Sequence, residues 1–149
     1  MNDNVDCYVD GSFNSISKVY GYAGIILYNN NEYIIKGHGD DSQYIMLENI
    51  AGELIATMKV LEFVKNKLKV NKVNVYYDYE GIEKLANGEW KRDRRLFKEY
   101  YNFIKSLKIE IVFHKVKSHS GIEFNEKVDR LAKLECGIIL NNLNNLNNI

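Results

Sequence analysis

Four carboxylates occupy positions where the fold could bring them together. Asp10 follows the alternating run that starts at Val5, and Asp78 follows Val-Tyr-Tyr, so each of them ends an apparent strand. Glu53 and Asp129 each lie beside apolar residues of an apparent helix. Asp129 lies close to the buried face of its helix, where an unpaired charge costs several kcal/mol or shifts its pKa. This placement indicates a partner cation.

Three of the four carboxylates also have a plainer interpretation. A strand-terminal Asp often forms a turn or caps a helix, which applies to Asp10 and Asp78. A Glu near a helix start, such as Glu53, favours the positive helix terminus. A site formed by four carboxylates, with no Cys and no dense His cluster, favours Mg²⁺ or Mn²⁺ over zinc. Two such ions activate a water and stabilise the leaving oxygen of a phosphodiester, which is nuclease chemistry.

The hydrophobic pattern predicts the elements that position these residues. Alternation predicts strands, the first ending at Gly11-Ser12, over residues 5–10, 20–28, 33–37, 73–77 and 109–113. Helical spacing predicts helices over residues 50–68, 81–86, 93–106 and 123–136. The order predicts an α/β fold with a mixed five-stranded sheet flanked by helices, in which three strands are antiparallel and two are parallel. The first and fourth strands are expected side by side, which places Asp10 and Asp78 at one ligand-binding edge.

The composition is that of one globular domain. The chain has 149 residues, of which 46% are hydrophobic and 27% charged. We expect the domain over residues 1–137 and an Asn-rich, low-complexity tail over residues 138–149. No apolar run approaches the roughly 20 residues of a membrane span, and the N-terminus lacks a signal pattern. We therefore expect a cytoplasmic monomer in which Cys7 and Cys136 are reduced thiols.

The charged residues are unevenly distributed along the chain, although their net charge is zero. A net charge of zero argues against nucleic-acid binding by bulk electrostatics. Residues 89–119 nevertheless hold nine Lys or Arg against four acids, so this segment is +5 and the remainder is −5. The segment fits a contact with phosphates, although a solvated helix face has the same composition.

Four segments of the chain resemble the type 1 ribonuclease H family. They are Tyr-Val-Asp-Gly-Ser at 8–12, Gly-Glu-Leu at 52–54, Tyr-Tyr-Asp at 76–78, and Val-Lys-Ser-His-Ser-Gly followed by Asn-Glu-Lys-Val-Asp-Arg-Leu-Ala within 116–132. The resemblance runs from about residue 5 to residue 134. It implies a ribonuclease H-like fold and an endonuclease that cuts the RNA strand of an RNA–DNA hybrid, leaving 3′-hydroxyl and 5′-phosphate ends.

The resemblance also implies catalytic roles. Asp10 would contact both of two Mg²⁺ ions, with Mn²⁺ as an alternative metal. Asp78 would complete one metal site, and Glu53 and Asp129 the other. His119 matches the family histidine that assists proton transfer and product departure, whereas a loop histidine outside this context is usually an incidental surface residue.

Substrate recognition is expected to depend on shape, through the 2′-hydroxyls of the RNA strand. Asn14 and Asn49 match positions where the family contacts the groove, and Asn125 matches an Asn beside the active site, although Asn in loops usually only forms turns. Trp90 is expected to contact the DNA strand by stacking. Alternatively, it is a core residue. Three basic residues after it are expected to bind by charge: Arg92, Arg94 and Arg95.

Two departures from the family concern binding. Tyr79-Glu80 follows Asp78 where Ser-Gln is common, and residues 80–113 are too few for the basic handle that many members carry. Three alternatives stay open. They are a non-catalytic hybrid-binding module, a related nuclease or polynucleotidyl transferase acting on another nucleic acid, and a metal-free hydrolase with paired carboxylates.

Overall fold

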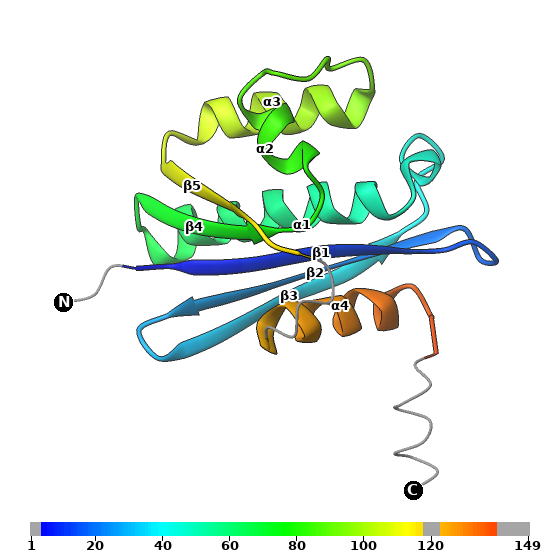
Figure 1. Ribbon diagram of the computed structural model, residues 1–149, viewed down its shortest axis with the longest axis horizontal. Helices are drawn as coiled ribbons and strands as arrows, with labels where there is room; N and C mark the ends of the chain where they lie inside the picture. Colours follow the sequence, from blue (N-terminus) through cyan, green and yellow to red (C-terminus); the bar gives the residue numbers. More distant parts are fainter. Residues whose placement is uncertain (1–3, 118–122, 140–149) are drawn as a thin grey trace, which may run out of the picture.

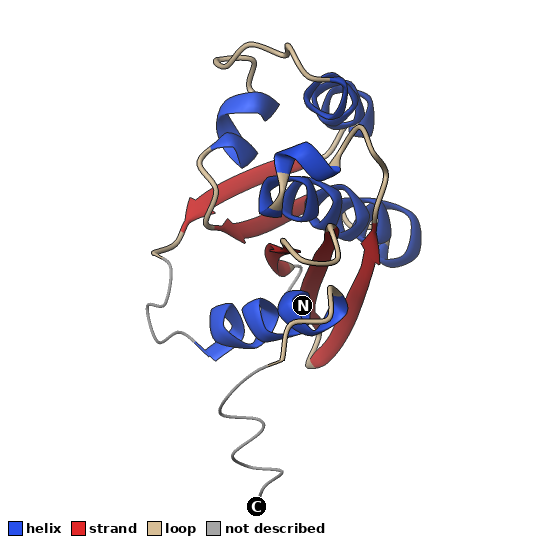
Figure 2. Ribbon diagram, turned by 90° about the vertical axis from the view of Figure 1, so that its right-hand side faces the viewer, coloured by secondary structure: helices blue, strands red, loops and turns tan. Residues whose placement is uncertain are grey.

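A five-stranded sheet with helices on both sides forms the centre of the molecule (Figures 1 and 2). The computed structural model describes residues 4–117 and 123–139. The strands are β1 (Asp6–Asn14), β2 (Val19–Tyr28), β3 (Asn31–Gly39), β4 (Lys72–Tyr77) and β5 (Glu110–Lys115), in the spatial order β3-β2-β1-β4-β5. β1, β2 and β3 pair antiparallel, whereas β4 pairs parallel with β1 and β5. The predicted mixed sheet is therefore confirmed.

The helices divide between the two faces of the sheet. They are α1 (Asn49–Phe63), which continues in a π-helical turn (Val64–Leu68), α2 (Gly81–Ala86), α3 (Arg95–Leu107) and α4 (Glu123–Glu135). α1 packs on β1 and β2 and carries α3 on its outer side, while α4 packs on the other face of the same strands. A short 3₁₀ turn (Ile45–Leu47), which the sequence pattern did not predict, precedes α1. No helix in the described part of the chain is long and apolar enough to cross a membrane.

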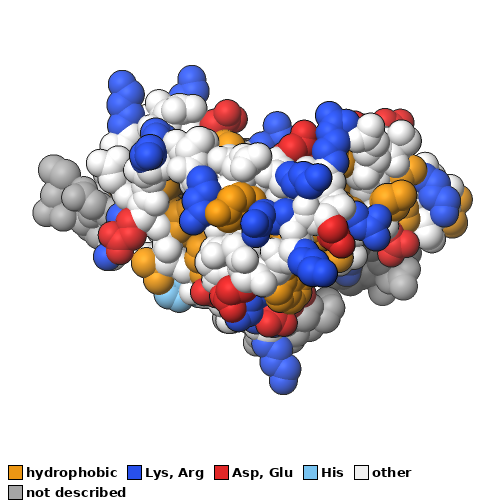
Figure 3. Space-filling view, turned by 90° about the horizontal axis from the view of Figure 1, so that it is seen from above, with side chains coloured by type: hydrophobic (Ala, Val, Ile, Leu, Met, Phe, Trp, Pro, Cys, Tyr) orange, Lys and Arg blue, Asp and Glu red, His pale blue; other side chains and the backbone are white. Residues whose placement is uncertain are grey.

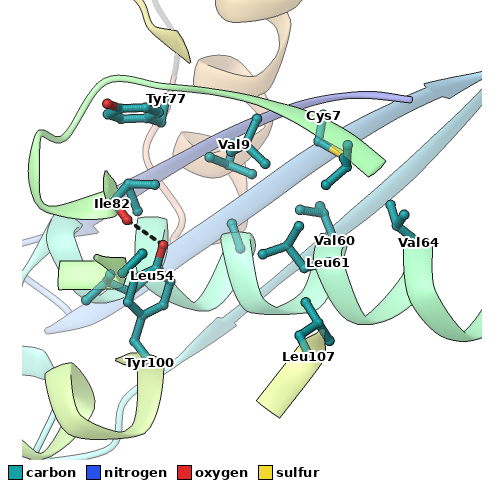
Figure 4. Close-up of a cluster of buried hydrophobic side chains, with 14 of the residues drawn as sticks. Cys7, Val9, Leu54, Val60, Leu61, Val64, Tyr77, Ile82, Tyr100 and Leu107 are labelled. Carbon is teal, nitrogen blue, oxygen red and sulfur yellow. Dashed lines mark hydrogen bonds between the residues drawn. The ribbon is translucent and has the colours of Figure 1, made fainter. Parts of the chain in front are cut away.

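The main core lies between the sheet and α1. Cys7 and Val9 of β1 face Leu54 and Leu61 of α1, and all four are at most 3% exposed (Figure 4). Because side chains alternate along a strand, the even-numbered residues of β1 face α4 instead, where Tyr8 packs beside a smaller cluster. Asp10 therefore shares the α4 face of the sheet.

β1 is longer than predicted, and its extra length shapes the site. The expected end at Gly11-Ser12 is wrong, because β1 continues to Asn14 through pairing with β2. Its parallel pairing with β4 reaches only from Asp6 to Tyr8. The two central strands separate beyond Tyr8, and Asp10 lies where they part.

Three glycines bring α1 into backbone contact with the sheet. A Cβ on Gly52 would lie 2.1 Å from the carbonyl oxygen of Gly21 and 2.9 Å from the Cα of Gly11. A Cβ on Gly11 would lie 2.3 Å from the backbone nitrogen of Glu53. No side chain fits between these backbones, so the start of α1 rests directly on β1 and β2. This contact places Glu53 behind Asp10.

Candidate active site

The predicted carboxylates meet at the point where β1 and β4 separate. Asp10 lies on β1, Asp78 directly follows β4, and Asp129 lies on α4. These three side chains line two adjoining hollows of the surface. The fourth carboxylate, Glu53 of α1, lies beneath them and is 2% exposed. The structure thus brings together residues that are 119 positions apart in the sequence, from Asp10 to Asp129.

Glu53 connects α1 to the end of β4. Its Oε2 accepts hydrogen bonds from the backbone N–H of Asp78 at 3.0 Å and of Tyr79 at 2.9 Å. Burial raises the pKa of Glu53 to about 7, against the opposing effect of these two donors. The same carboxylate therefore fixes the backbone that carries Asp78.

Asp10 lies at the centre of the negative charge. Its Oδ1 accepts a hydrogen bond from the N–H of Gly11 at 2.9 Å. Burial, followed by the charges of Glu53 and Asp129, raises the pKa of Asp10 to about 9. Asp129 in turn contacts the ammonium group of Lys133, one helical turn later, at 3.0 Å. Asp129 thus raises the pKa of Asp10 even though it already contacts a cationic partner.

The donor set fits hard divalent cations. Carboxylate oxygens are the ligands that Mg²⁺ and Mn²⁺ prefer, and a cation would offset the charge that raises the pKa of Asp10. Within residues 4–117 and 123–139, no three acidic, His or Cys side chains are arranged to hold a metal ion as they lie. In this arrangement Glu53 accepts hydrogen bonds from backbone amides, and Asp129 contacts Lys133. A bound cation would compete with these partners.

The three Asn residues expected to contact the substrate have different surroundings in the structure. Asn49, the first residue of α1, and Asn125 each line one of the hollows that contain Asp10. Asn14 instead secures a turn. Its Nδ2 donates to the carbonyl of Cys136 at 3.0 Å, and its Oδ1 accepts from the N–H of Ile16 at 3.0 Å. The turn-forming interpretation of Asn14 therefore accounts for both ends of its side chain.

Trp90 and the three arginines lie on the surface around α2 and α3. Trp90 is 37% exposed and meets the edge of Tyr79 at 6.0 Å between ring centroids, so it is not a core residue. Arg92 lies over the ring of Tyr101, at 4.2 Å from its centroid. Lys and Arg side chains are spread over this face of the molecule (Figure 3). Arg94 and Arg95 bond across to the segment before α1, through Met46 and Gln43.

Comparison with known proteins assigns the family. The RNase H family model matches residues 2–136. The chain belongs to the RNase H family. A ribonuclease H of Francisella philomiragia is 31% identical over 143 residues, covering 87% of this chain and 89% of that protein. One of Neorickettsia sennetsu is 29% identical over 150 residues, covering 90% of this chain and 93% of that protein.

Solved structures of RNase H proteins share the fold. RNase H1 of the halophilic archaeon Halobacterium salinarum superposes with a TM-score of 0.66 at 16% identity, covering 89% of this chain and 96% of that one. An N-terminal RNase H domain of Mycobacterium tuberculosis, fused to maltose-binding protein, gives a TM-score of 0.68 at 18% identity, covering 89% and 93%. Members of the RNase H family generally depend on divalent metals.

The sequence analysis did not single out two residues that lie at or beside the candidate site, Lys133 and Gly52. A predicted residue, His119, lies outside the described part of the chain. Lys133 is four residues after Asp129, and this helical spacing was the available signal. Gly52 was noted only as part of a motif, because its contact with β1 and β2 depends on the tertiary fold. His119 belongs to residues 118–122, which lie outside the described residues.

Proposed function

We propose that this RNase H cleaves the RNA strand of RNA–DNA hybrids with two divalent metal ions, Mg²⁺ or Mn²⁺, held by four carboxylates. The observation that carries the proposal is the convergence of Asp10, Glu53, Asp78 and Asp129 from β1, α1, the end of β4 and α4. The RNase H relatives support the substrate class. The products would carry 3′-hydroxyl and 5′-phosphate ends.

Each carboxylate has a distinct part in the proposed mechanism. Asp10, on which the charges of both Glu53 and Asp129 act, would contact both ions. Asp78 would complete one metal site, and Glu53 and Asp129 the other. When bound, the ions supply an activated water and stabilise the leaving oxygen. Glu53 additionally holds the backbone of Asp78 in place. We retain His119 as the residue that assists proton transfer and product departure.

The substrate would extend from the carboxylates toward α2 and α3. Asn49 and Asn125 line the hollows at the metal site and are proposed to contact the RNA strand. Trp90 and the basic residues after it are proposed to contact the DNA strand, because Trp90 is partly exposed and the arginines follow it closely in the sequence. These basic residues are Arg92, Arg94 and Arg95.

The proposed catalytic unit is one chain, since a single protomer supplies every carboxylate. Residues 1–137 would form the catalytic domain, followed by a tail over residues 138–149. We also propose a cytoplasmic location, the compartment in which free thiols persist. Cys7 and Cys136 are both free and buried, in agreement with that location.

The test compares substrates, metals and matched variants. Purified protein would receive end-labelled RNA–DNA hybrid, RNA duplex, DNA duplex or single-stranded RNA, with Mg²⁺, Mn²⁺ or EDTA. Asp10→Asn should reduce hybrid cleavage by at least about 10²-fold, because several kcal/mol of metal-dependent stabilisation are lost. Asp6→Asn is the matched control, since Asp6 lies on the same strand but bonds Asn74 rather than the other carboxylates.

Each outcome distinguishes a functional class. RNA-strand cutting that is confined to the hybrid and requires metal and Asp10 supports the proposal. Hybrid binding without cutting under every metal would identify a non-catalytic module. Cutting of another nucleic acid would identify a related nuclease, and cleavage that persists in EDTA would contradict metal dependence.

A further inference from the structure

Among residues 4–117 and 123–139, β3 has a partner strand on one of its two edges. It is the nine-residue strand Asn31–Gly39 at the edge of the sheet, and within these residues its partner strand is β2 (Figure 1). In the described part of the chain, no further backbone–backbone hydrogen bond involves the outer side of β3. Unpaired N–H and C=O groups along an edge are a template for another strand.

The hairpin turn determines which residues form this edge. Asn29 and Asn30 have φ values of 51° and 65°, and Tyr28 opposes Asn31, which is the geometry of a two-residue turn. In such a hairpin, Asn31 and every second residue after it bond back to β2. The residues between them direct their N–H and C=O groups outward: Glu32, Ile34, Lys36 and His38.

The outward-bonding residues carry a symmetrical charge pattern. Ile34 is 45% exposed, and Glu32 and Lys36 flank it with opposite charges, each two positions away. All three lie on the α4 face of the sheet, since Glu32 pairs with Lys127 and Lys36 with Glu135. An antiparallel copy of this pattern is complementary to itself.

We propose that β3 pairs antiparallel with β3 of a second copy of this chain, about a two-fold axis through Ile34. In this register Ile34 opposes Ile34, and Glu32 opposes Lys36 on both sides of the axis. Neighbouring registers have less complementary side-chain pairs. A two-fold axis through Ile35 would place Lys36 opposite the apolar Ile34, and an axis through Lys36 would place the two Lys36 ammonium groups opposite each other. The chain's net charge of zero adds no bulk repulsion between copies.

The side chains of β3 on the α1 face of the sheet also match those of a second copy. Tyr33 and Ile35 face α1, and the ring of Tyr33 packs on Phe63 with 5.1 Å between centroids. A surface hollow beside them is lined by Ile35, Phe63 and the Lys59–Lys67 part of α1 and its π-helical turn. In the proposed register Tyr33 of each copy opposes Ile35 of the other, at the side of this hollow. Apolar side chains therefore meet across the axis on both faces of the joined sheet.

The proposed dimer replaces the monomer expected from the sequence, but each chain remains a complete catalytic unit. β3 lies at the edge of the sheet, and β2 separates it from the strand that carries Asp10. Each copy keeps its own four carboxylates. Cleavage per chain should be unchanged by association, so failure of the dimer proposal and failure of the catalytic proposal are distinguishable.

Sedimentation of the full chain with charge reversals tests the proposal. Between about 10 µM and about 1 mM, the range suited to a small interface, the weight-average mass should rise from that of a monomer toward that of a dimer. Glu32→Lys or Lys36→Glu places like charges opposite each other twice, which should raise the dissociation constant about tenfold or more. The double variant, Glu32→Lys with Lys36→Glu, restores opposite charges between copies and should restore association.

The double variant also excludes an intramolecular explanation. It turns the contacts with Lys127 and Glu135 into repulsions, so recovered association would come from pairing between copies. As a register test, Ile34→Cys should give a disulfide-linked dimer on mild oxidation, since opposed Cα atoms lie about 5.5 Å apart in such a pair. His38→Cys is the control and should not. A monomer at the highest concentration, single reversals that associate like the wild type, or a double variant without rescue would each overturn the proposal.

Discussion

Gly52→Ala should reduce both stability and catalysis, because α1 touches the sheet through its backbone. The new Cβ would lie 2.1 Å from the carbonyl oxygen of Gly21 and 2.9 Å from the Cα of Gly11. Neither atom belongs to a side chain that can rotate. The start of α1 must therefore retreat from β1 and β2 by about 1 Å to regain normal contact distances.

The magnitude follows from two opposing effects. Overpacking costs about 1–3 kcal/mol, and a collision with rigid backbone on two strands belongs near the upper end. Alanine stabilises a helix by about 1 kcal/mol relative to glycine. The net loss is about 2 kcal/mol, which lowers the melting temperature by about 4–8 °C for a chain of this size. Because Glu53 is the next residue, a displacement of about 1 Å should lower kcat by about 10²-fold.

Thermal unfolding and hybrid-cleavage kinetics would measure the two effects, with Gly24→Ala as the matched control. A Cβ on Gly24 would lie 2.3 Å from Cγ1 of Val60, a side-chain methyl that can turn, and Gly24 does not contact Glu53. This control should lose stability but keep a kcat within about threefold of the wild type. A Gly52→Ala protein with unchanged stability and kcat would refute the backbone-contact argument. Equal losses of kcat in both variants would instead indicate general destabilisation.

Three further predictions follow from individual contacts. Asp10→Asn should raise the melting temperature in EDTA. Because the pKa of Asp10 is raised from 3.8 to about 9, the folded state disfavours the carboxylate, and wild-type stability falls as pH rises between those values. The variant should lose this pH dependence and gain about 1–3 kcal/mol near neutral pH, whereas Mg²⁺ should stabilise only the wild type. Tyr100→Phe should cost about 1–2 kcal/mol in urea unfolding with kcat unchanged, since the buried Tyr100 hydroxyl donates to the Ile82 carbonyl at 2.7 Å; Tyr101→Phe, at a partly exposed site, is the comparison. Asn14→Ala should lower the melting temperature but leave hybrid affinity within about twofold, because its side chain bonds the turn and Cys136. A tenfold loss of affinity at unchanged stability would instead support the groove contact expected from the family resemblance.

The pairing of β1 with β4 and the meeting of Asp10 with Asp78 followed from local pattern, whereas the metal-site roles of Glu53 and Asp129 were implied by the family resemblance. Alternation in 5–10 and 73–77, together with the helical crossover between them, sufficed to place Asp10 and Asp78 at one edge. The pattern could not show that β1 continues past Gly11, because Gly11-Ser12 has the composition of a turn. Pairing with β2, a tertiary interaction, extends the strand to Asn14.

The sequence could not predict which groups the side chains of the site contact. Nothing in the segment around Glu53 indicates that its carboxylate faces the amides of Asp78 and Tyr79, because those groups come from another element. The same holds for Asn14, whose partner Cys136 is 122 residues away. Residue type predicted which side chains could do chemistry, whereas their present contacts depend on the packing of α1 and α4.

The two-residue turn at Asn29-Asn30 also limits how this chain can change in length. One residue inserted there would shift the register of β3 and turn each of its side chains to the opposite face. Ile35 would then face α4, and Glu32 and Lys36 would lose Lys127 and Glu135. The exposed connection between α2 and α3 pairs with no strand and has no such constraint. Extra residues, from evolution or from design, should therefore preserve the fold at residues 87–94 and disrupt it at the hairpin. An insertion at residues 87–94 would still displace Trp90 and Arg92, which are proposed to contact the DNA strand.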